Sequence, residues 1–421
     1  MKQRQGSLLE PYRVLDLTDE KGLNCGRVIG DMGAEVIKIE KPGGDPARSI
    51  GPFYHDSPDP EKSLFWLFMC MNKKSITLNL ETIEGRDVFR KLVKTSDFVV
   101  ESFDPGYLSS LGLGYEDLEK INPAIIMVSI TLFGQEGPYK DYAASDMVVW
   151  AMSGFMYLSG DLDRAPVQIS YPQAFLHAAT TAAAGALAAL FHRHASGQGQ
   201  RVDVSVQEVC SWIATDAHLY SELLDEEIVR AGSGRTSPFP KGEVRFRYVY
   251  PCKDGYVFYL APGVNVLLAA ARAWNQWLAE AGISTGHMEH FGWPAKLDFT
   301  QMSPEDVDTM QDTLGSLMLK YTKAELYQNA LTRDIPLVPV AAPGELFENA
   351  QLADRDFWID QEYPALGNSI VCPGPWARTT PAPLTGWRSA PRIGEHNEEI
   401  YIGDLELTLE QMILLKQTGV I

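Results

Sequence analysis

The sequence is poor in cysteine and lacks the short motifs that mark several common enzyme classes. Its five cysteines are never spaced as CxxC, which disfavours both a disulfide framework and a zinc site. No GxGxxG follows the first strand-like segment, and no GxxxxGK(S/T), GxSxG or HExxH occurs in the chain. We therefore predict no nicotinamide cofactor, no P-loop chemistry and no metal centre. The scattered thiols suit a reducing, cytoplasmic location.

Basic residues and long apolar runs are also scarce. The chain has 36 lysines and arginines against 55 aspartates and glutamates, and the resulting formal charge of −19 repels nucleic acid and anionic membranes. No apolar run follows the N-terminal residues 1–5, so they are not typical of a signal peptide. The most apolar stretch, 175–191, is short and interrupted by polar residues, which favours a buried helix over a membrane span. We expect neither a nucleic-acid partner nor membrane association.

The N-terminal third alternates strand-like and helical patterns. Apolar, β-branched runs separated by helices of about ten residues indicate βαβ units and a parallel sheet, which is a Rossmann-like α/β arrangement. The strands are expected at 12–18, 34–40, 75–80, 97–103 and 124–130.

A chain of 421 residues is too long for one ordinary hydrophobic core, so two domains are expected. After residue 242 the pattern changes to a strand pair with a turn at Asp254 and Gly255, followed by amphipathic helices. This change predicts a smaller α+β domain inserted into the first. The expected division is a large domain over 1–225, a small domain over 226–335, and a return to the large domain with a C-terminal wrapping segment over 336–421.

Cationic residues stand beside the expected strands. Arg48 closes a loop that follows the strand at 34–40, and Lys73 and Lys74 directly precede the strand at 75–80. Ligands of open α/β sheets bind at strand ends, and guanidinium and ammonium groups stabilise phosphate oxygens. We interpret the three cations as contacts to a phosphorylated ligand, with solvated surface cations as the alternative interpretation.

A series of sequence blocks resembles the class III CoA-transferases, the family of the carnitine and formyl-CoA transferases. The blocks occur in the family's order over the first half of the chain: VLDLT, GDMGAEVIKIEKPGGDPAR, NKKSITLNL, VVESFDPG, LGLGYEDLEKINPAIIMVSIT, FGQEGPY, SDMVVWAMSGFMYLSG and GQGQRVDVSVQE. The resemblance implies a Rossmann-like large domain built from both chain ends, a small inserted domain, and two chains interlocked as linked rings. It also implies a CoA thioester as substrate and no metal or nicotinamide.

The family's nucleophile is an aspartate ahead of an Ala-rich helix, and the resemblance places Phe175 at that position. Phenylalanine cannot attack a thioester, and no Asp or Glu lies between Arg164 and Arg201. We therefore assign no catalytic residue. Asp146 is the fallback acid, and the alternative for it is a structural role as the cap of the helix that follows.

The CoA-binding loop departs from the family's pattern as well. Asp104 and Ser110 stand where the family commonly has basic residues, and an aspartate near phosphates costs affinity. The residues that the resemblance assigns to CoA contact are Arg48, Asn72, Lys73, Lys74, Ser102, Phe103 and Lys140.

The first hypothesis for function is a non-catalytic subunit of a heteromeric CoA-transferase, paired with a paralogous catalytic subunit that supplies the aspartate. The DEKGLNCG opening and the PQAFLHA block look similar to the aspartate-lacking subunit of benzylsuccinate CoA-transferases. The expected donor is therefore succinyl-CoA, and the expected acceptor is an aromatic dicarboxylate such as benzylsuccinate. Two alternatives stay open: a self-sufficient CoA-transferase, racemase or lyase of CoA esters that uses another acid such as Asp146, and a non-enzymatic CoA-ester-binding scaffold.

Overall fold

The computed structural model divides the chain into two compact units. The first joins Met1–Met156, Gln168–Glu226 and Ala350–Ile421, and the second joins Tyr157–Val167 and Glu227–Asn349. The domain boundaries expected after residues 225 and 335 are a separate prediction, which this division into units does not test. The residues described are 6–225, 227–239, 242–260, 264–297, 302–364, 366–380, 382–384 and 386–421.

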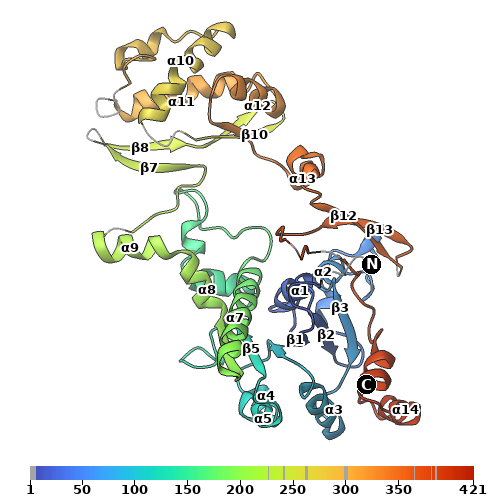
Figure 1. The fold of residues 1–421 in the computed structure, drawn as a ribbon. Coiled ribbons are helices and arrows are strands. Elements are labelled where there is room, and N and C mark those ends of the chain that lie inside the picture. Colours follow the sequence, from blue (N-terminus) through green and yellow to red (C-terminus); the bar gives the residue numbers. More distant parts are fainter. Residues whose placement is uncertain are drawn as a thin grey trace. The chain divides into compact units, whose positions relative to one another are not determined.

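A six-stranded parallel sheet forms the centre of the first unit (Figure 1). Its order, β3-β2-β1-β4-β5-β6, reverses direction between β1 and β4, which is the Rossmann arrangement predicted from the alternating pattern. Each of the five predicted strands is confirmed. The bounds are β1 Arg13–Leu17, β2 Glu35–Glu40, β3 Lys73–Thr77, β4 Phe98–Glu101, β5 Ile126–Thr131 and β6 Gln200–Ser205.

Alternate residues of the four central strands, β2, β1, β4 and β5, supply two separate hydrophobic cores. On β4, for example, Phe98 and Val100 join one core while Val99 joins the other. The first core is covered by α1 Leu23–Asp31, α6 Asp146–Met152, α7 Ala174–Ser196 and α8 Val206–Ile213. The second is covered by α3 Ile83–Val93, α4 Tyr107–Ser110, α5 Tyr115–Ile121 and the C-terminal α14 Leu409–Gln417.

Helix α7 is the apolar stretch seen in the sequence, and it is confirmed as a helix with a buried face. In the described part of the chain it is the one helix long and apolar enough to cross a membrane, with a mean hydropathy of 1.6 over its most apolar window. Its small side chains pack against β5, β6, α1 and α8. The buried alanines are Ala174, Ala178, Ala179, Ala182, Ala183, Ala186 and Ala189.

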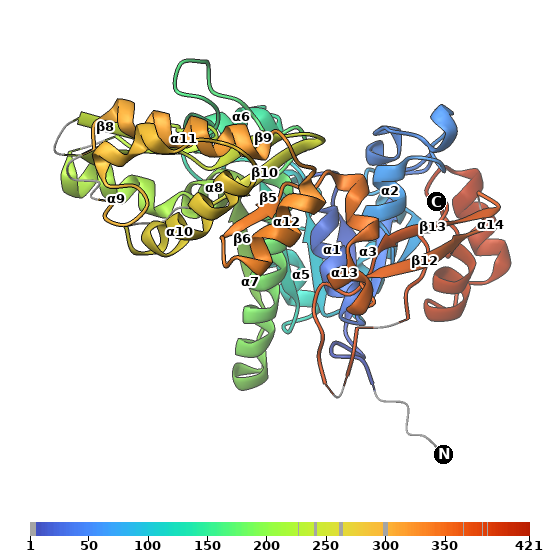
Figure 2. The same ribbon diagram turned by 90° about the horizontal axis from the view of Figure 1, so that it is seen from above.

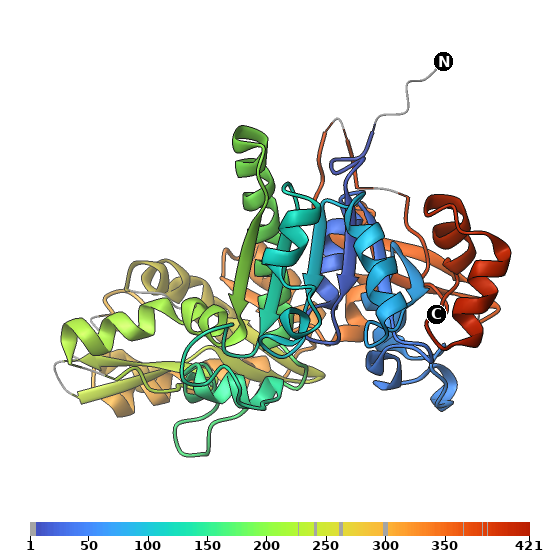
Figure 3. The same cartoon turned by 90° about the horizontal axis from the view of Figure 1, so that it is seen from below.

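The C-terminal segment closes the β3 edge of the sheet, at the opposite end from α7 (Figure 2 and Figure 3). The backbone N–H of His396 donates to the Ser75 carbonyl at 2.9 Å, and the Ser75 N–H donates to His396 Nδ1 at 3.2 Å. Asn397 accepts from the Thr77 N–H at 2.9 Å and donates to Thr77 Oγ1 at 2.8 Å. These contacts satisfy backbone groups that an open edge strand exposes. A hairpin, β12 Trp358–Tyr363 and β13 Asn368–Pro373, precedes this segment.

The second unit has an antiparallel sheet and helices, in agreement with the α+β pattern predicted for the middle of the chain. The predicted turn at Asp254 and Gly255 joins β9 and β10. Trp274 and Trp277 stack in its core with ring centroids 5.4 Å apart. Its elements are β7 Gly234–Phe239, β8 Gly242–Arg247, β9 Val249–Cys252, β10 Gly255–Tyr259, α10 Val264–Glu280, α11 Pro304–Met318, α12 Lys323–Thr332 and β11 Leu337–Pro339.

The contact of Asn397 with the sheet edge gives a test of the C-terminal closure. We expect Asn397→Ala to lower the free energy of unfolding by about 2 kcal/mol, because the buried N–H of Thr77 loses its acceptor. Urea denaturation followed by tryptophan fluorescence measures the change. Asn368→Ala, at an exposed hairpin position, is the control and is expected to cost less than about 0.5 kcal/mol. Equal effects of the two variants would contradict the assigned closure.

Candidate functional site

A cleft of about 210 Å³ opens at the carboxyl edge of the sheet, around the point where the strand order reverses. Ligands of open α/β sheets bind at this edge because the loops leaving neighbouring strands diverge there. The walls are largely apolar, formed by Leu17, Ile39, Leu78, Leu80, Phe103 and Tyr107. Polar side chains enter the lining from Asp19, Glu40, Lys41, Asp45 and Ser102.

The two strands at the reversal point are tied together across the cleft. Ser102, which follows β4, accepts from the Asp19 N–H at 2.9 Å and donates to Asp19 Oδ1 at 2.8 Å. Asp19 follows β1 and also pairs with Lys21. On the β4 side, the rings of Phe103 and Tyr107 lie with their centroids 4.7 Å apart. The loops that form the cleft are therefore held by side-chain contacts rather than left free.

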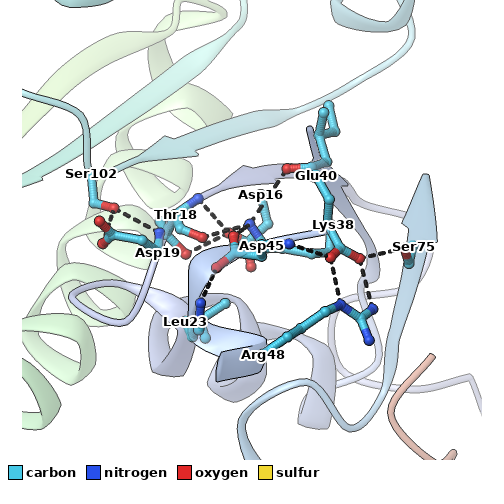
Figure 4. A network of polar contacts seen from close by, with 12 residues as sticks. Asp16, Thr18, Asp19, Leu23, Lys38, Glu40, Asp45, Arg48, Ser75 and Ser102 are labelled. Carbon is cyan, nitrogen blue, oxygen red and sulfur yellow. Dashed lines mark hydrogen bonds and ion pairs between the residues drawn. The ribbon is translucent and has the colours of Figure 1, made fainter. Parts of the chain in front are cut away.

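A network of buried ion pairs includes Glu40 and Asp45 of the cleft lining (Figure 4). Lys73 Nζ contacts Asp16 Oδ2 at 2.8 Å, and Lys38 Nζ contacts Asp45 Oδ2 at 2.8 Å. Burial acts to raise the pKa of Asp16, but the charges of Lys73 and Lys38 outweigh it and hold that pKa below its ordinary value. Burial likewise acts to lower the pKa of Lys38, which Asp45 and Asp16 nevertheless raise. Asp16 and Lys38 therefore stay charged inside the protein.

Arg48 and Glu40 form the other half of this network. The guanidinium donates to both carboxylate oxygens of Glu40, at 2.6 and 2.9 Å. Its Cζ atom lies 3.8 Å from the centroid of the Trp66 ring. Arg48 and the Trp66 indole N–H both donate to the carbonyl oxygen of Pro391, so the network also anchors the C-terminal segment. Ser75 adds a hydrogen bond to Glu40 at 2.6 Å.

Helix α1 approaches the network closely because of one glycine. A Cβ atom at Gly26 would lie 2.3 Å from Asp16 Oδ2, a distance that side chains do not tolerate. Lys73 Nζ also donates to the Leu23 carbonyl at 2.7 Å, at the first turn of α1. The sequence block that contains Gly26 thus serves the contact between helix and sheet.

The structure separates the seven residues that the resemblance assigned to CoA contact. Ser102 and Phe103 line the cleft. Arg48 and Lys73 lie beneath it, with side chains 1% and 0% exposed, and their ion pairs disfavour contact with a ligand phosphate. Lys140 lies exposed in the loop after β5 and does not line the cleft.

Lys74 and Asn72 lie at the opposite, amino-terminal edge of the sheet. Lys74 pairs with Glu35 and, at 2.8 Å, with Glu399. Asn72 donates to Asp31 at 2.6 Å and accepts from the Arg388 N–H at 2.8 Å. The physical reason is chain direction: these residues precede or begin their strand, whereas the cleft lies where parallel strands end. This geometry disfavours Lys74 and Asn72 as contacts to a ligand in the cleft.

Lys41 and Tyr107 line the cleft and were not assigned from the sequence. Lys41 directly follows the last residue of β2, so its place at a strand's carboxyl end was the available signal. Its ammonium contacts Glu81 Oε1 at 2.8 Å, and the two side chains are 62% and 60% exposed.

Phe175 occupies the first turn of α7, where no acidic residue is present. The Phe175 side chain is only 8% exposed and belongs to the core that contains Trp150. Its backbone N–H donates to Asp146 Oδ2 at 3.0 Å, and Gln168 donates to Asp146 Oδ1 at 3.1 Å. Asp146 is buried and uses both oxygens as acceptors, one of them for a free N–H at the start of α7. Asp146 therefore caps α7, although it is itself the first residue of α6.

The described residues contain no group of three or more His, Cys, Asp and Glu side chains placed to hold a metal ion.

Comparisons with known proteins give matches along most of the chain. The family model described as CoA-transferase family III matches residues 9–397. Subunit BbsE of succinyl-CoA:(R)-benzylsuccinate CoA-transferase from Thauera aromatica is 34% identical, covering 93% of this chain and 93% of that protein. Succinyl-CoA–D-citramalate CoA-transferase from Chloroflexus aurantiacus is 32% identical, covering 100% and 99%. The crystal structure of a CAIB/BAIF family protein from Brucella suis superimposes with a TM-score of 0.80 at 25% identity, covering 95% of this chain and 100% of that one.

Glu101, the last residue of β4, gives a pH-dependent prediction. Burial raises its pKa from 4.5 to about 7, against the lowering effect of hydrogen bonds from Ser129 and the Phe103 N–H. Because the folded-state pKa is the higher one, the folded chain keeps a proton that the unfolded chain releases, and stability falls as the pH rises from about 4.5 to 7. We expect the stability of Glu101→Gln relative to the wild type to increase by roughly 2.5 kcal/mol between pH 5 and pH 8.

Urea denaturation of both proteins at the two pH values measures this difference. Glu222→Gln, at an exposed position of α9 Thr215–Leu224, is the matched control and is expected to follow the wild type at both pH values. A Glu101→Gln variant that follows the wild type as closely as the control does would rule out the raised pKa.

Proposed function

Because the chain belongs to CoA-transferase family III, as its sequence blocks predicted, we propose that it is the non-catalytic subunit of a heteromeric CoA-transferase. The observation that carries the proposal is Phe175, a buried apolar side chain in the first turn of α7, where the family resemblance expects the nucleophilic aspartate. A paralogous chain supplies that aspartate, and the two chains interlock.

The chemistry explains why one chain alone is insufficient. In the reaction that the family resemblance implies, an aspartate carboxylate attacks the thioester carbonyl, the CoA thiolate leaves, and the acyl group stays on the carboxylate as a mixed anhydride. The thiolate then attacks the aspartyl carbonyl, which releases the donor acid and leaves an aspartyl thioester. The acceptor carboxylate then attacks the aspartyl thioester and displaces the CoA thiolate, which gives a second mixed anhydride. The thiolate attacks the acceptor's acyl carbonyl, which forms the new CoA thioester and frees the aspartate. The aspartate side chain starts this sequence as the nucleophile and carries both covalent intermediates, and the phenyl ring of Phe175 can do neither.

Asp146 is poorly placed to replace that carboxylate. Both of its oxygens already accept hydrogen bonds, from the Phe175 N–H and from Gln168. Releasing either oxygen for attack on a thioester leaves a buried donor without a partner, which costs about 1–3 kcal/mol before any chemistry begins. This supports a structural role for Asp146.

The cleft at the carboxyl edge of the sheet is the place we propose for part of a CoA ester. Its volume of about 210 Å³ is smaller than the pockets that enclose a whole drug-sized ligand, so it suits one ring system with the remainder of the molecule outside. The apolar walls and the rings of Phe103 and Tyr107 favour a flat aromatic base. We propose Ser102 and Phe103 as contacts in this cleft.

The proposed donor is succinyl-CoA, and the proposed acceptor is an aromatic dicarboxylate such as benzylsuccinate. Both of the similar CoA-transferases named above carry succinyl-CoA in their names, and one of them is a subunit of the benzylsuccinate enzyme.

The complementation experiment tests the proposal. CoA transfer from succinyl-CoA to benzylsuccinate and other carboxylic acids is measured with this chain alone, and then with the chain co-expressed with its paralogue. We expect the isolated chain to be at least about 100-fold slower than the mixture, because a missing nucleophile commonly costs several powers of ten in rate.

Replacement of the paralogue's aspartate by alanine is the control and is expected to abolish activity of the mixture. Robust activity of the isolated chain would contradict the proposal, and an inactive mixture that still binds CoA esters would favour a non-enzymatic scaffold.

Asp146→Asn separates a capping role from a catalytic one. An asparagine keeps only one acceptor oxygen, so we expect the free energy of unfolding to fall by about 1 kcal/mol. The transfer rate of the co-expressed complex is expected to stay within about twofold of the wild type. Asp141→Asn, at an exposed position of the same unit, is the control for both measurements. A loss of about a thousandfold in rate without unfolding would instead identify Asp146 as a nucleophile.

A further inference from the structure

Lys41 is the one basic side chain among the described residues that line the cleft. The acidic side chains of the lining are each neutralised within the protein: Glu40 by Arg48, Asp45 by Lys38, and Asp19 by Lys21. The charge that a phosphorylated ligand meets at the cleft therefore depends on Lys41. The described lining residues that follow β4, which are Ser102, Phe103 and Tyr107, add no further cation.

Glu81 holds this cation. Its Oε1 lies 2.8 Å from Lys41 Nζ, and the pair is exposed at the surface beside Leu80, which lines the cleft. The Glu81 backbone is itself fixed, because its N–H donates to Asn79 Oδ1 at 3.0 Å and the Asn79 N–H donates to the Val420 carbonyl at 2.7 Å. Glu81 is thus kept at the start of α3, next to the cleft.

An exposed ion pair of this kind is weak by itself, but a carboxylate beside the one cation of the described cleft lining opposes an approaching anion. A phosphate that binds Lys41 must either displace Glu81 or accept a like charge within a few ångströms. The hydrogen bond between the two raises the pKa of Lys41 and lowers that of Glu81, so both are charged at neutral pH.

We propose that Glu81 is an affinity-determining residue, which weakens the binding of a phosphorylated CoA ester to this chain by occupying Lys41. The inference rests on the proposed function, because it takes the cleft as the site of a CoA ester. It adds that this subunit binds CoA weakly by its own side chains.

Binding of coenzyme A and of dephospho-coenzyme A to the full-length chain, measured by calorimetry at low and high salt, tests the role of Glu81. We expect Glu81→Gln to tighten the binding of coenzyme A by about threefold to tenfold at low salt, with a smaller gain at high salt because screening weakens both interactions. Glu84→Gln removes the same charge from an exposed position one turn along the chain and is expected to change binding by less than about twofold.

A double-variant cycle tests whether Glu81 affects coenzyme A binding through Lys41. Lys41→Gln is expected to weaken binding, and adding Glu81→Gln to it is expected to recover only a small part of the gain seen in the wild-type background. Unchanged or weaker binding in Glu81→Gln would overturn the inference, as would a gain that persists in full without Lys41. Absence of coenzyme A binding in the wild type and in every variant would overturn it as well, while the complementation assay would decide the proposed function separately.

Discussion

The buried ion pair of Asp16 and Lys73, with the charge of Lys38 nearby, is the interaction on which the first unit depends most. Asp16 lies on β1, Lys38 on β2 and Lys73 on β3, so these groups join three adjacent strands of the sheet. Removing one partner of a buried ion pair commonly costs 3–5 kcal/mol, because the remaining charge is left without compensation. Gly26 lets α1 approach this pair, and the Leu23 carbonyl completes it, so the position of the helix follows from the position of the charges.

The same network explains the electrostatics of the cleft. Arg48 and Lys73 carry positive charge, but each forms a buried ion pair, with Glu40 and Asp16 respectively. Because both side chains are buried in ion pairs, Arg48 and Lys73 are poorly placed to contact a phosphate in the cleft. What remains at the rim is Lys41, and the neighbouring Glu81 decides how much of its charge reaches the solvent. Near the cleft, the ion pairs of Arg48 and Lys73 stabilise the fold, and this leaves Lys41 to attract an anionic ligand.

The start of α7 shows a different compromise. A helix N-terminus with exposed N–H groups favours a negative charge, and a carboxylate there gains from the helix dipole. This chain meets that requirement with Asp146, which comes from another helix, and fills the adjacent position with the apolar ring of Phe175. The electrostatic requirement of this helix start is thus satisfied without an acidic residue in the first turn of α7 itself. Such an arrangement suits a subunit whose contribution is structural support and partner binding.

The sequence by itself determined the parallel sheet, the long Ala-rich helix and the absence of an acid between Arg164 and Arg201, because these depend on local composition and order. It did not determine which cations are buried. Lys73 meets Asp16 across 57 positions of the chain, and Asp146 reaches the Phe175 N–H across 29. Pairings of this kind arise only when strands and helices from distant segments are packed together, since a lysine beside a strand has the same local pattern whether it faces solvent or a buried carboxylate. The tertiary structure therefore decided that Arg48 and Lys73 support the fold, that Asp146 caps α7, and that Lys41 is the cation left at the cleft.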